Sequence, residues 1–438
     1  MNRLPLLNLM ILALAAMLAA CSASRSGVAV PELLPRNAAI GSAEEQVRMI
    51  TVYGELKQAI EANPKDYRRR LQLAQLFMLE ARATGEHGHY YPAAIQVLDA
   101  ILAEKPAQDI VFGAVSLKAS VLLSLHQFDE ARKLAEYAVS LNGYNALIYG
   151  SLVDAQVELG NYEAAVQMCD KMMSIRPDLR SYSRVSYLRE LHGDLPGAIE
   201  AMKMAAESGL PGYEETAWCR LNLGGLYERQ GKLDLARAEY ERILAERPKY
   251  PFAIAALAGI EQKEGHPELA EQRLKAAMDI IPEVGFYADL AGLYQQTGRT
   301  EEAGRLTRTV LEMLADDEAK GHMMGLEYAQ VHLDLTGDYA KALEYARKEY
   351  ERRPGNIGVN QLMAAIYLKM NNLPAAKQHL ETAMRTRSSD PELLCIAGIA
   401  SLRDSQPAKG LELLGAAFEL DPYQDHAFAD EARSYASK

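Results

Sequence analysis

The chain has 438 residues, of which 49% are hydrophobic and 24% are charged, so it has enough apolar material for an extended core. Its 47 basic and 59 acidic residues give a formal net charge of −12. General nucleic-acid binding needs a basic surface that neutralises phosphates, so this balance argues against it. The period-two alternation typical of strands is absent from the sequence, and we expect an all-α protein.

The amino terminus has the features of an export signal in residues 1–20. Asn2-Arg3 is a short positive region, and Leu4 to Ala16 is an apolar stretch too short to span a membrane comfortably. Leu18-Ala19-Ala20-Cys21 resembles the lipobox of bacterial lipoproteins. The resemblance implies cleavage before Cys21, acylation of this residue and, with Ser22 next, a lipid anchor in the outer membrane facing the periplasm. An ordinary secretory peptide with an incidental cysteine is the alternative.

Two short segments are expected between the signal and the main body of the chain. The sequence up to about Ser42 is rich in Ser, Ala, Pro and Gly and shows no helical period. We therefore expect residues 21–42 to be the lipidated cysteine and a flexible tether. Residues 43–64 predict an N-terminal capping helix, because Val52 to Pro64 has the pattern of a second repeat helix without a first one.

A unit of about 34 residues then recurs along the chain. In its clearest copy, which begins at Ala217, the marker residues Leu223, Gly224, Tyr227, Gly231, Ala236, Tyr240 and Pro248 stand at offsets 7, 8, 11, 15, 20, 24 and 32. This pattern resembles the tetratricopeptide repeat (TPR), a helix-turn-helix unit. The resemblance implies a right-handed superhelical solenoid of about ten repeats in residues 65–422. Residues 423–438 are then expected to form a C-terminal capping helix and tail.

One small residue in the second helix of each repeat fixes the register. The residues at this position are Ala94, Ala131, Ala165, Ala198, Ala236, Ala270, Ala303, Ala342, Ala376 and Gly410. Most repeats close at a proline, but Leu210 and Ala315 are substitutes. An insertion at Thr84 to Tyr91 is expected to lengthen the turn within the first repeat. Asp316 to Gly321 is expected to be a spacer between the seventh and eighth repeats.

Three segments show a narrower resemblance. Tyr90-Tyr-Pro-Ala-Ala94, Arg176-Pro-Asp-Leu179 and especially the block from Arg184 to Met202, which begins Arg-Val-Ser-Tyr-Leu-Arg-Glu-Leu-His-Gly-Asp, are similar to a bacterial family of TPR-only proteins. The similarity covers roughly residues 65–425. Members of that family have no assigned enzymatic activity, so the resemblance implies a binding protein.

Motifs of catalysis are absent from the sequence. It contains no His-Glu-x-x-His, Gly-x-x-x-x-Gly-Lys, Gly-x-Ser-x-Gly or Cys-x-x-Cys. We therefore expect no enzyme, no catalytic residues, no cofactor and no metal. Cys169, Cys219 and Cys395 are predicted to be buried free thiols. His87 and His89 could ligate a metal, but the lack of a cysteine or carboxylate cluster beside them favours a solvated loop.

The concave face of a TPR array is lined by the first helices of the repeats, and it is the expected binding groove. Side chains predicted to face it in the fourth to sixth repeats are Arg180, Arg184, Tyr187, Glu190, Trp218, Arg229 and Phe252. Aromatic and arginine side chains are typical anchors of protein interfaces. The alternative is that Trp218 caps a seam between repeats and that the arginines pair with Glu190 and its neighbours.

Two functions remain open on the sequence alone. The first is a non-catalytic scaffold, a membrane-anchored TPR lipoprotein whose concave groove binds a peptide or helix of an envelope assembly, secretion or export component. The second is an accessory binding protein of a small-molecule or metal-uptake system, with His87, His89 and the arginine and tryptophan patch as its site. A long open groove suits a peptide, whereas a small ligand needs a closed pocket.

Overall fold

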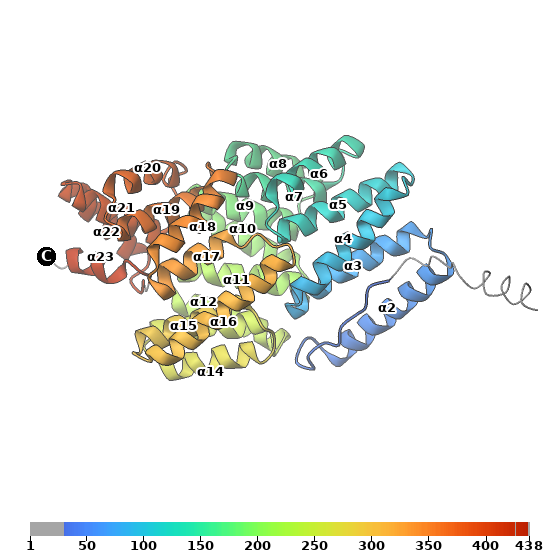
Figure 1. Ribbon diagram of the computed structural model, residues 1–438, viewed down its shortest axis with the longest axis horizontal. Coiled ribbons are helices and arrows are strands. Elements are labelled where there is room, and N and C mark those ends of the chain that lie inside the picture. Colours follow the sequence, from blue (N-terminus) through green and yellow to red (C-terminus); the bar gives the residue numbers. More distant parts are fainter. Residues whose placement is uncertain (1–29, 425, 437–438) are drawn as a thin grey trace, which may run out of the picture.

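The computed structural model describes residues 30–424 and 426–436 of the chain (Figure 1). The predicted signal peptide, Cys21 and the first part of the predicted tether lie outside the described residues. Every regular element in the described ranges is a helix. The predicted all-α solenoid of helix-turn-helix repeats is confirmed.

Ten helix pairs, numbered here as units 1 to 10, lie between α2 (Ala43–Ala62) and α23 (Ala429–Ala436). The first helices of the units, called A helices, are α3 (Tyr67–Thr84), α5 (Gln108–Ser124), α7 (Ala146–Glu158), α9 (Leu179–Leu191), α11 (Glu214–Glu228), α13 (Pro251–Lys263), α15 (Val284–Gln296), α17 (Gly325–Val331) with the π-helical η1 (His332–Thr336), α19 (Ile357–Lys369) and α21 (Pro391–Arg403). The second helices, called B helices, are α4 (His87–Ala103), α6 (Phe128–Leu141), α8 (Tyr162–Ile175), α10 (Leu195–Ser208), α12 (Leu233–Glu246), α14 (Pro267–Met278), α16 (Thr300–Ala319), α18 (Tyr339–Arg352), α20 (Leu373–Ala383) and α22 (Pro407–Leu420).

The repeat pattern forms these pairs because small residues let the two helices of a unit touch. Ala236 of α12 has no exposed surface. A Cβ atom on Gly224 of α11 would collide with the ring of Tyr240, so only glycine fits there. The hydroxyl of Tyr240 donates to the carboxylate of Glu228, 2.6 Å away, which satisfies the polar end of this buried ring.

The two predicted insertions are mostly helical. In unit 1, α4 begins at His87, so most of the inserted residues extend the B helix instead of lengthening the turn. In unit 7, α16 continues beyond the predicted closing residue Ala315 to Ala319. No proline stops the helix there, and a pair between Asp316 and Lys320 at 2.5 Å joins its last turns.

Residues 30–42 differ from the predicted flexible tether. The guanidinium of Arg36 donates from Nε to the buried carboxylate of Glu80 at 2.7 Å. The side-chain amide of Asn37 donates to the carbonyl of Asp279 at 2.8 Å, and Ile40 is 6% exposed. This segment packs on the solenoid because it carries apolar side chains and a charge that finds a buried partner. The predicted tether over residues 21–29 lies outside the described residues.

The superhelix makes more than one turn, and its successive turns touch. The A–B turn of each of units 1 to 5 lies against the loop that follows the unit five places further along. The residues that meet are Gly85 and Ile281, Gln127 and Gly321, Gly160 and Gly355, Gly193 and Arg387, and Gly231 and Pro422. In Figure 1 the orange and red helices of the C-terminal half accordingly lie next to the units in the middle of the chain. The loop after α18 bonds the end of α7, and the loop after α20 meets the turn after α9.

The third of these contacts between turns is the most extensively bonded. Arg353 donates to Glu158 of unit 3 at 2.5 Å, and its guanidinium lies 4.9 Å from the ring centroid of Phe128. The side chain of Asn356 donates to the carbonyl of Glu158 at 2.9 Å. The hydroxyl of Tyr162 accepts from the backbone N–H of Ile357, also at 2.9 Å. Charge pairing and backbone bonds thus join residues almost 200 positions apart.

Candidate binding surface

The concave face of the solenoid is formed by the A helices. Consecutive A helices such as α7, α9 and α11 contact one another, whereas consecutive B helices are farther apart and lie on the outside. Tyr187 of α9 and Trp218 of α11 are large side chains on A helices that stay exposed, by 41% and 44%. Although the Tyr187 side chain as a whole is 41% exposed, the protein around its phenol group raises the pKa of that group well above its usual value, with the nearby Glu158 as a further cause. Tyr187 is therefore an uncharged donor at neutral pH.

Arg184 lies across two units. Its Nε donates to Asp154 at 2.9 Å and its Nη2 donates to the same carboxylate at 2.5 Å. A Cβ atom on Gly150 of α7 would lie 3.0 Å from the guanidinium carbon of Arg184, so the side chain covers this glycine. Arg184 thus joins α7 to α9 as well as lining the concave face.

The other two predicted arginines are also paired across units. Arg180 donates to Glu215 at 2.5 Å, and Arg229 pairs with Glu190. The side chains of Arg180 and Arg229 are 40% and 51% exposed, and ion pairs with this exposure contribute only about 0–1 kcal/mol. The predicted alternative, in which the arginines pair with Glu190 and its neighbours, describes the protein without a bound partner. Such weak pairs can be exchanged for pairs with a bound partner.

Phe252 does not lie where the sequence pattern suggested. Its ring packs against Tyr250 and Phe286, with centroid distances of 5.5 Å and 5.6 Å. It is therefore part of the seam between units 6 and 7, because the neighbouring unit supplies a ring of its own at that point. Phe252 is a packing residue in this structure.

Sequence reasoning missed two exposed apolar residues that precede Trp218 in the chain. Leu210 and Tyr213, in the loop before α11, are 64% and 57% exposed. The loop is held by α12, since Glu246 accepts from the N–H of Gly212 at 2.9 Å and Arg247 donates to its carbonyl at 2.8 Å. The signal was an apolar residue at the closing position where a proline is usual, together with a tyrosine just before a helix.

The structure shows what surrounds the three cysteines and the two histidines that were predicted to lie in a loop. Cys169, Cys219 and Cys395 are free and buried, as predicted, and burial raises the pKa of Cys169 to about 11. His89 hydrogen-bonds the carbonyl of Glu32 at 2.9 Å, whereas His87 stacks on Tyr91. The two histidines therefore point to different partners and do not form a pair of ligands.

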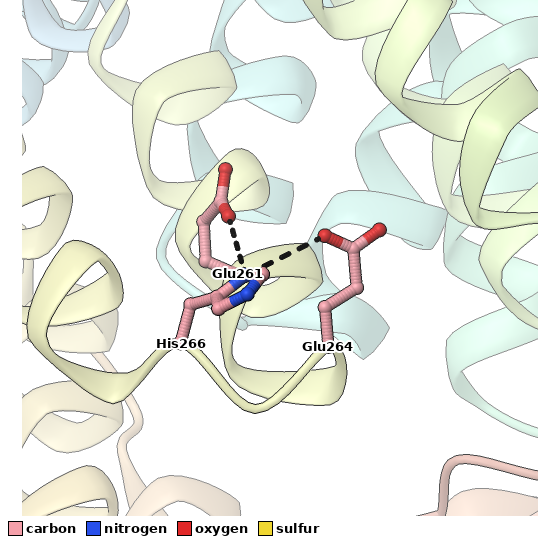
Figure 2. Close-up of side chains that lie close together, drawn as sticks. All are labelled: Glu261, Glu264 and His266. Atoms are coloured by element: carbon pink, nitrogen blue, oxygen red, sulfur yellow. Dashed lines mark ion pairs between the residues drawn. The ribbon is translucent and has the colours of Figure 1, made fainter.

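A cluster of Glu261, Glu264 and His266 lies at the A–B turn of unit 6 (Figure 2). The ring of His266 lies 3.5 Å from the Glu261 carboxylate. Arg237 pairs with both glutamates, at 2.9 Å and 2.7 Å, and Arg273 pairs with Glu261 at 3.1 Å. These guanidinium groups already neutralise the carboxylates, so we interpret the cluster as an ion-pair network.

Two shallow depressions occur away from the concave residues described above. One of about 250 Å³ is lined by residues of α14, α15 and α16, and one of about 340 Å³ is lined by residues of α20 and by Asp404. Neither contains a residue of α7, α9 or α11. Within the described residues, no helix is both long and apolar enough to cross a membrane.

Comparison with known proteins identifies the repeats. A model of the tetratricopeptide repeat matches residues 122–191 and 335–394, and a second model of the same repeat matches residues 192–251. The chain thus contains tetratricopeptide repeats. Repeats of this kind generally bind other proteins and are generally non-catalytic.

The chain is similar to segments of much larger proteins. It is 26% identical over 292 residues to protein CTR9 homolog of Arabidopsis thaliana, covering 64% of this chain and 26% of that protein. It is 28% identical over 239 residues to cellulose synthase operon protein C of Xanthomonas axonopodis pv. citri, covering 50% of this chain and 15% of that protein. Among solved structures, a TPR protein of Thermus thermophilus has 22% identity and a TM-score of 0.39, with coverage of 45% of this chain and 99% of that one.

Proposed function

We propose that the protein is a non-catalytic scaffold that binds a segment of a partner protein at the concave rim of units 4 and 5. One observation carries the proposal: Trp218, the only tryptophan of the chain, is 44% exposed in α11, and Leu210 and Tyr213 in the loop that leads into this helix are exposed as well. Exposed apolar and aromatic side chains that gather in one place mark interaction sites. Burying the tryptophan and tyrosine against a partner would supply the apolar centre of an interface.

The paired arginines give this rim its polar part. Arg180, Arg184 and Arg229 each lie beside a carboxylate from a neighbouring unit. A partner segment that presents acidic or carbonyl oxygens can compete for the two more exposed guanidiniums. Arg184 is held by two bonds to Asp154 and is the better fixed of the three.

The proposal includes an anchor at the bacterial cell envelope through acylated Cys21, and a partner that is an envelope assembly, secretion or export component. The lipobox-like sequence that ends at Cys21 supports this. The described residues begin at Val30, nine positions after Cys21, so at most about 30 Å of extended chain separates the two. The anchored solenoid would therefore work close to the membrane surface.

The test uses a photo-crosslinking amino acid at position 213 in cells that produce the full-length protein. We expect one discrete protein adduct, and we expect Trp218→Ala to reduce it at least tenfold, because central aromatic anchors typically contribute about 2 kcal/mol or more. The matched control is the crosslinker at position 203 of α10, where Lys203 pairs with Glu200 at 2.8 Å.

Equal adducts from positions 213 and 203, or an adduct at 213 that Trp218→Ala leaves unchanged, would refute the binding rim. Melting of the purified Trp218→Ala protein separates loss of binding from loss of folding. A melting temperature close to that of the wild type is expected, because a half-exposed side chain contributes little to the core.

A further inference from the structure

The start of α4 in unit 1 also contacts the loop after unit 7, and this contact between superhelical turns contains a cluster of aromatic and imidazole rings. His87, in the first turn of α4, stacks on Tyr91 with a centroid distance of 5.4 Å. His322, in the loop after α16, lies 6.1 Å from His87 and 5.9 Å from Tyr91. Tyr91 is 4% exposed and His322 is 6% exposed. Rings from two different turns of the solenoid therefore form one buried cluster.

Both ring nitrogens of His322 are buried without a hydrogen-bond partner in the described part of the chain. An imidazolium needs an acceptor for each N–H, so this site is built for the neutral ring. The charged and titratable groups around the two histidines are Arg82 of α3, Glu86 at the start of α4, His126 in the turn of unit 2, Asp317 and Lys320 at the end of α16, Glu283 before α15 and Glu327 of α17.

The charged and titratable groups that act on His87 oppose a positive charge on its ring. Burial lowers the pKa of His87, the proximity of His322, His126 and Arg82 acts in the same direction, and together they bring this pKa to about 4. Burial also lowers the pKa of His322, although Asp317 partly offsets this. Both rings are therefore neutral at pH 7.

We propose that His87 and His322 form a pH-sensitive latch that holds the two turns of the solenoid together at neutral pH and releases them in acid. Protonation would place positive charges on rings 6.1 Å apart, one of them without an acceptor. Loss of this contact separates the first turn of α4 from the loop after unit 7 and opens the side of the superhelix. The contact of unit 3 with the loop after unit 8, which contains the bonds of Arg353 and Asn356, stays closed.

The direction of the effect follows from the lowered pKa of His87. A histidine in the open form titrates near 6.5, so the latch is fully stable above that pH and weakens as the pH falls through 6.5 towards 4. With values of 6.5 in the open form and about 4 in the closed form, linkage predicts that the closed form loses stability by about 30-fold between pH 7.5 and pH 5.0.

Hydrogen exchange of two backbone amides tests the latch in the full-length protein. The N–H of Met323 donates to the carbonyl of Leu125 across the turns at 3.1 Å, next to His322. The N–H of Ile357 donates to Tyr162 across the turns at a contact without these histidines. After correction for the intrinsic pH dependence of exchange, protection at Met323 should fall about 30-fold from pH 7.5 to 5.0, while protection at Ile357 should change little.

Two substitutions identify the titrating rings. His87→Phe and His322→Phe keep a flat ring but cannot be protonated, so each should reduce the pH dependence at Met323, and the double variant should abolish it. His266→Gln is the control, because His266 lies in the A–B turn of unit 6, outside the contacts described for units 1 to 5. This substitution should leave the pH dependence at Met323 unchanged. If either phenylalanine variant fails to fold, the wild-type comparison of Met323 with Ile357 still decides. Protection at Met323 that is independent of pH, or an equal loss at both amides, would overturn the latch.

Discussion

A single methyl group decides how closely the two helices of a repeat approach. The small residues that fix the register, from Ala94 to Gly410, are all buried in the structure, and Ala236 has no exposed surface. The sequence predicts these positions well, because each needs only a local helix pair. The same holds for Cys169, Cys219 and Cys395, whose burial follows from their places within helices.

Substitution of Ala236 by leucine should therefore destabilise unit 5. The added atoms enter the closest contact between α11 and α12, and overpacking of this kind costs about 1–3 kcal/mol. Native-state hydrogen exchange should show the loss in units 4 to 6, since a solenoid is stabilised by nearest neighbours. The neighbouring Leu235→Ala, at a site that is 47% exposed, is the control and should have little effect. A uniform loss of protection along the whole chain would contradict this account.

At the scale of elements, the segment of residues 30–42 lies against α2, α3 and α4, where it bonds Tyr53, Glu80 and Tyr90. Arg36 holds it there, with a side chain that is 7% exposed and ion pairs to Glu80 and Glu45. The sequence of this segment has no helical period, and the segment packs on the solenoid in extended form. The lack of a helical period is also the reason why a tether is predicted there.

Arg36→Ala should release this segment and leave the fully buried carboxylate of Glu80 without its partner. Breaking a buried pair in this way costs about 3–5 kcal/mol. The matched control is Arg68→Ala, which removes a pair whose side chains are 81% and 61% exposed and should cost about 0–1 kcal/mol. Hydrogen exchange of α3 measures both losses, and equal losses in the two variants would show that the segment does not stabilise α3.

The helices could be predicted from the sequence because each depends on contacts within its own unit. The contacts between distant units were harder to predict. Arg353 and Asn356 look like ordinary loop residues in the sequence, yet both bond Glu158 of unit 3. Such contacts depend on the pitch of the superhelix, which small rotations between units determine. Phe252 was misplaced for a related reason: its offset points to the groove only if the next unit does not supply Phe286 to pack against it.

At the scale of the whole molecule, the anchor is a prediction that lies outside the described residues. Cys21→Ser should leave an uncleaved or soluble protein, because the residue proposed to carry the lipid is lost. Wild-type protein should be recovered in the membrane fraction and should resist washing with high salt, since an acyl anchor is apolar. Identical fractionation of the two proteins would exclude the lipoprotein interpretation and leave the binding rim to be tested separately.

The central structural claim is that the two turns of the solenoid dock with an offset of five units and so form one closed body. Glycine at position 160 is required twice, once by its positive φ of 79° and once because a Cβ atom would collide with the backbone of Gly355. Gly298 has a similar φ of 74° but open space around it. Alanine at either site costs about 1–2 kcal/mol of backbone strain, so the two variants differ only in the contact between turns.

Hydrogen exchange of the Ile357 amide, which donates to Tyr162 across the turns, tests this claim most directly. We predict that Gly160→Ala lowers protection of this amide at least tenfold and that small-angle X-ray scattering shows a larger radius of gyration. Gly298→Ala should keep both values close to those of the wild type. Equal protection of Ile357 and equal radii of gyration in the two variants would show that the turns are not docked in solution.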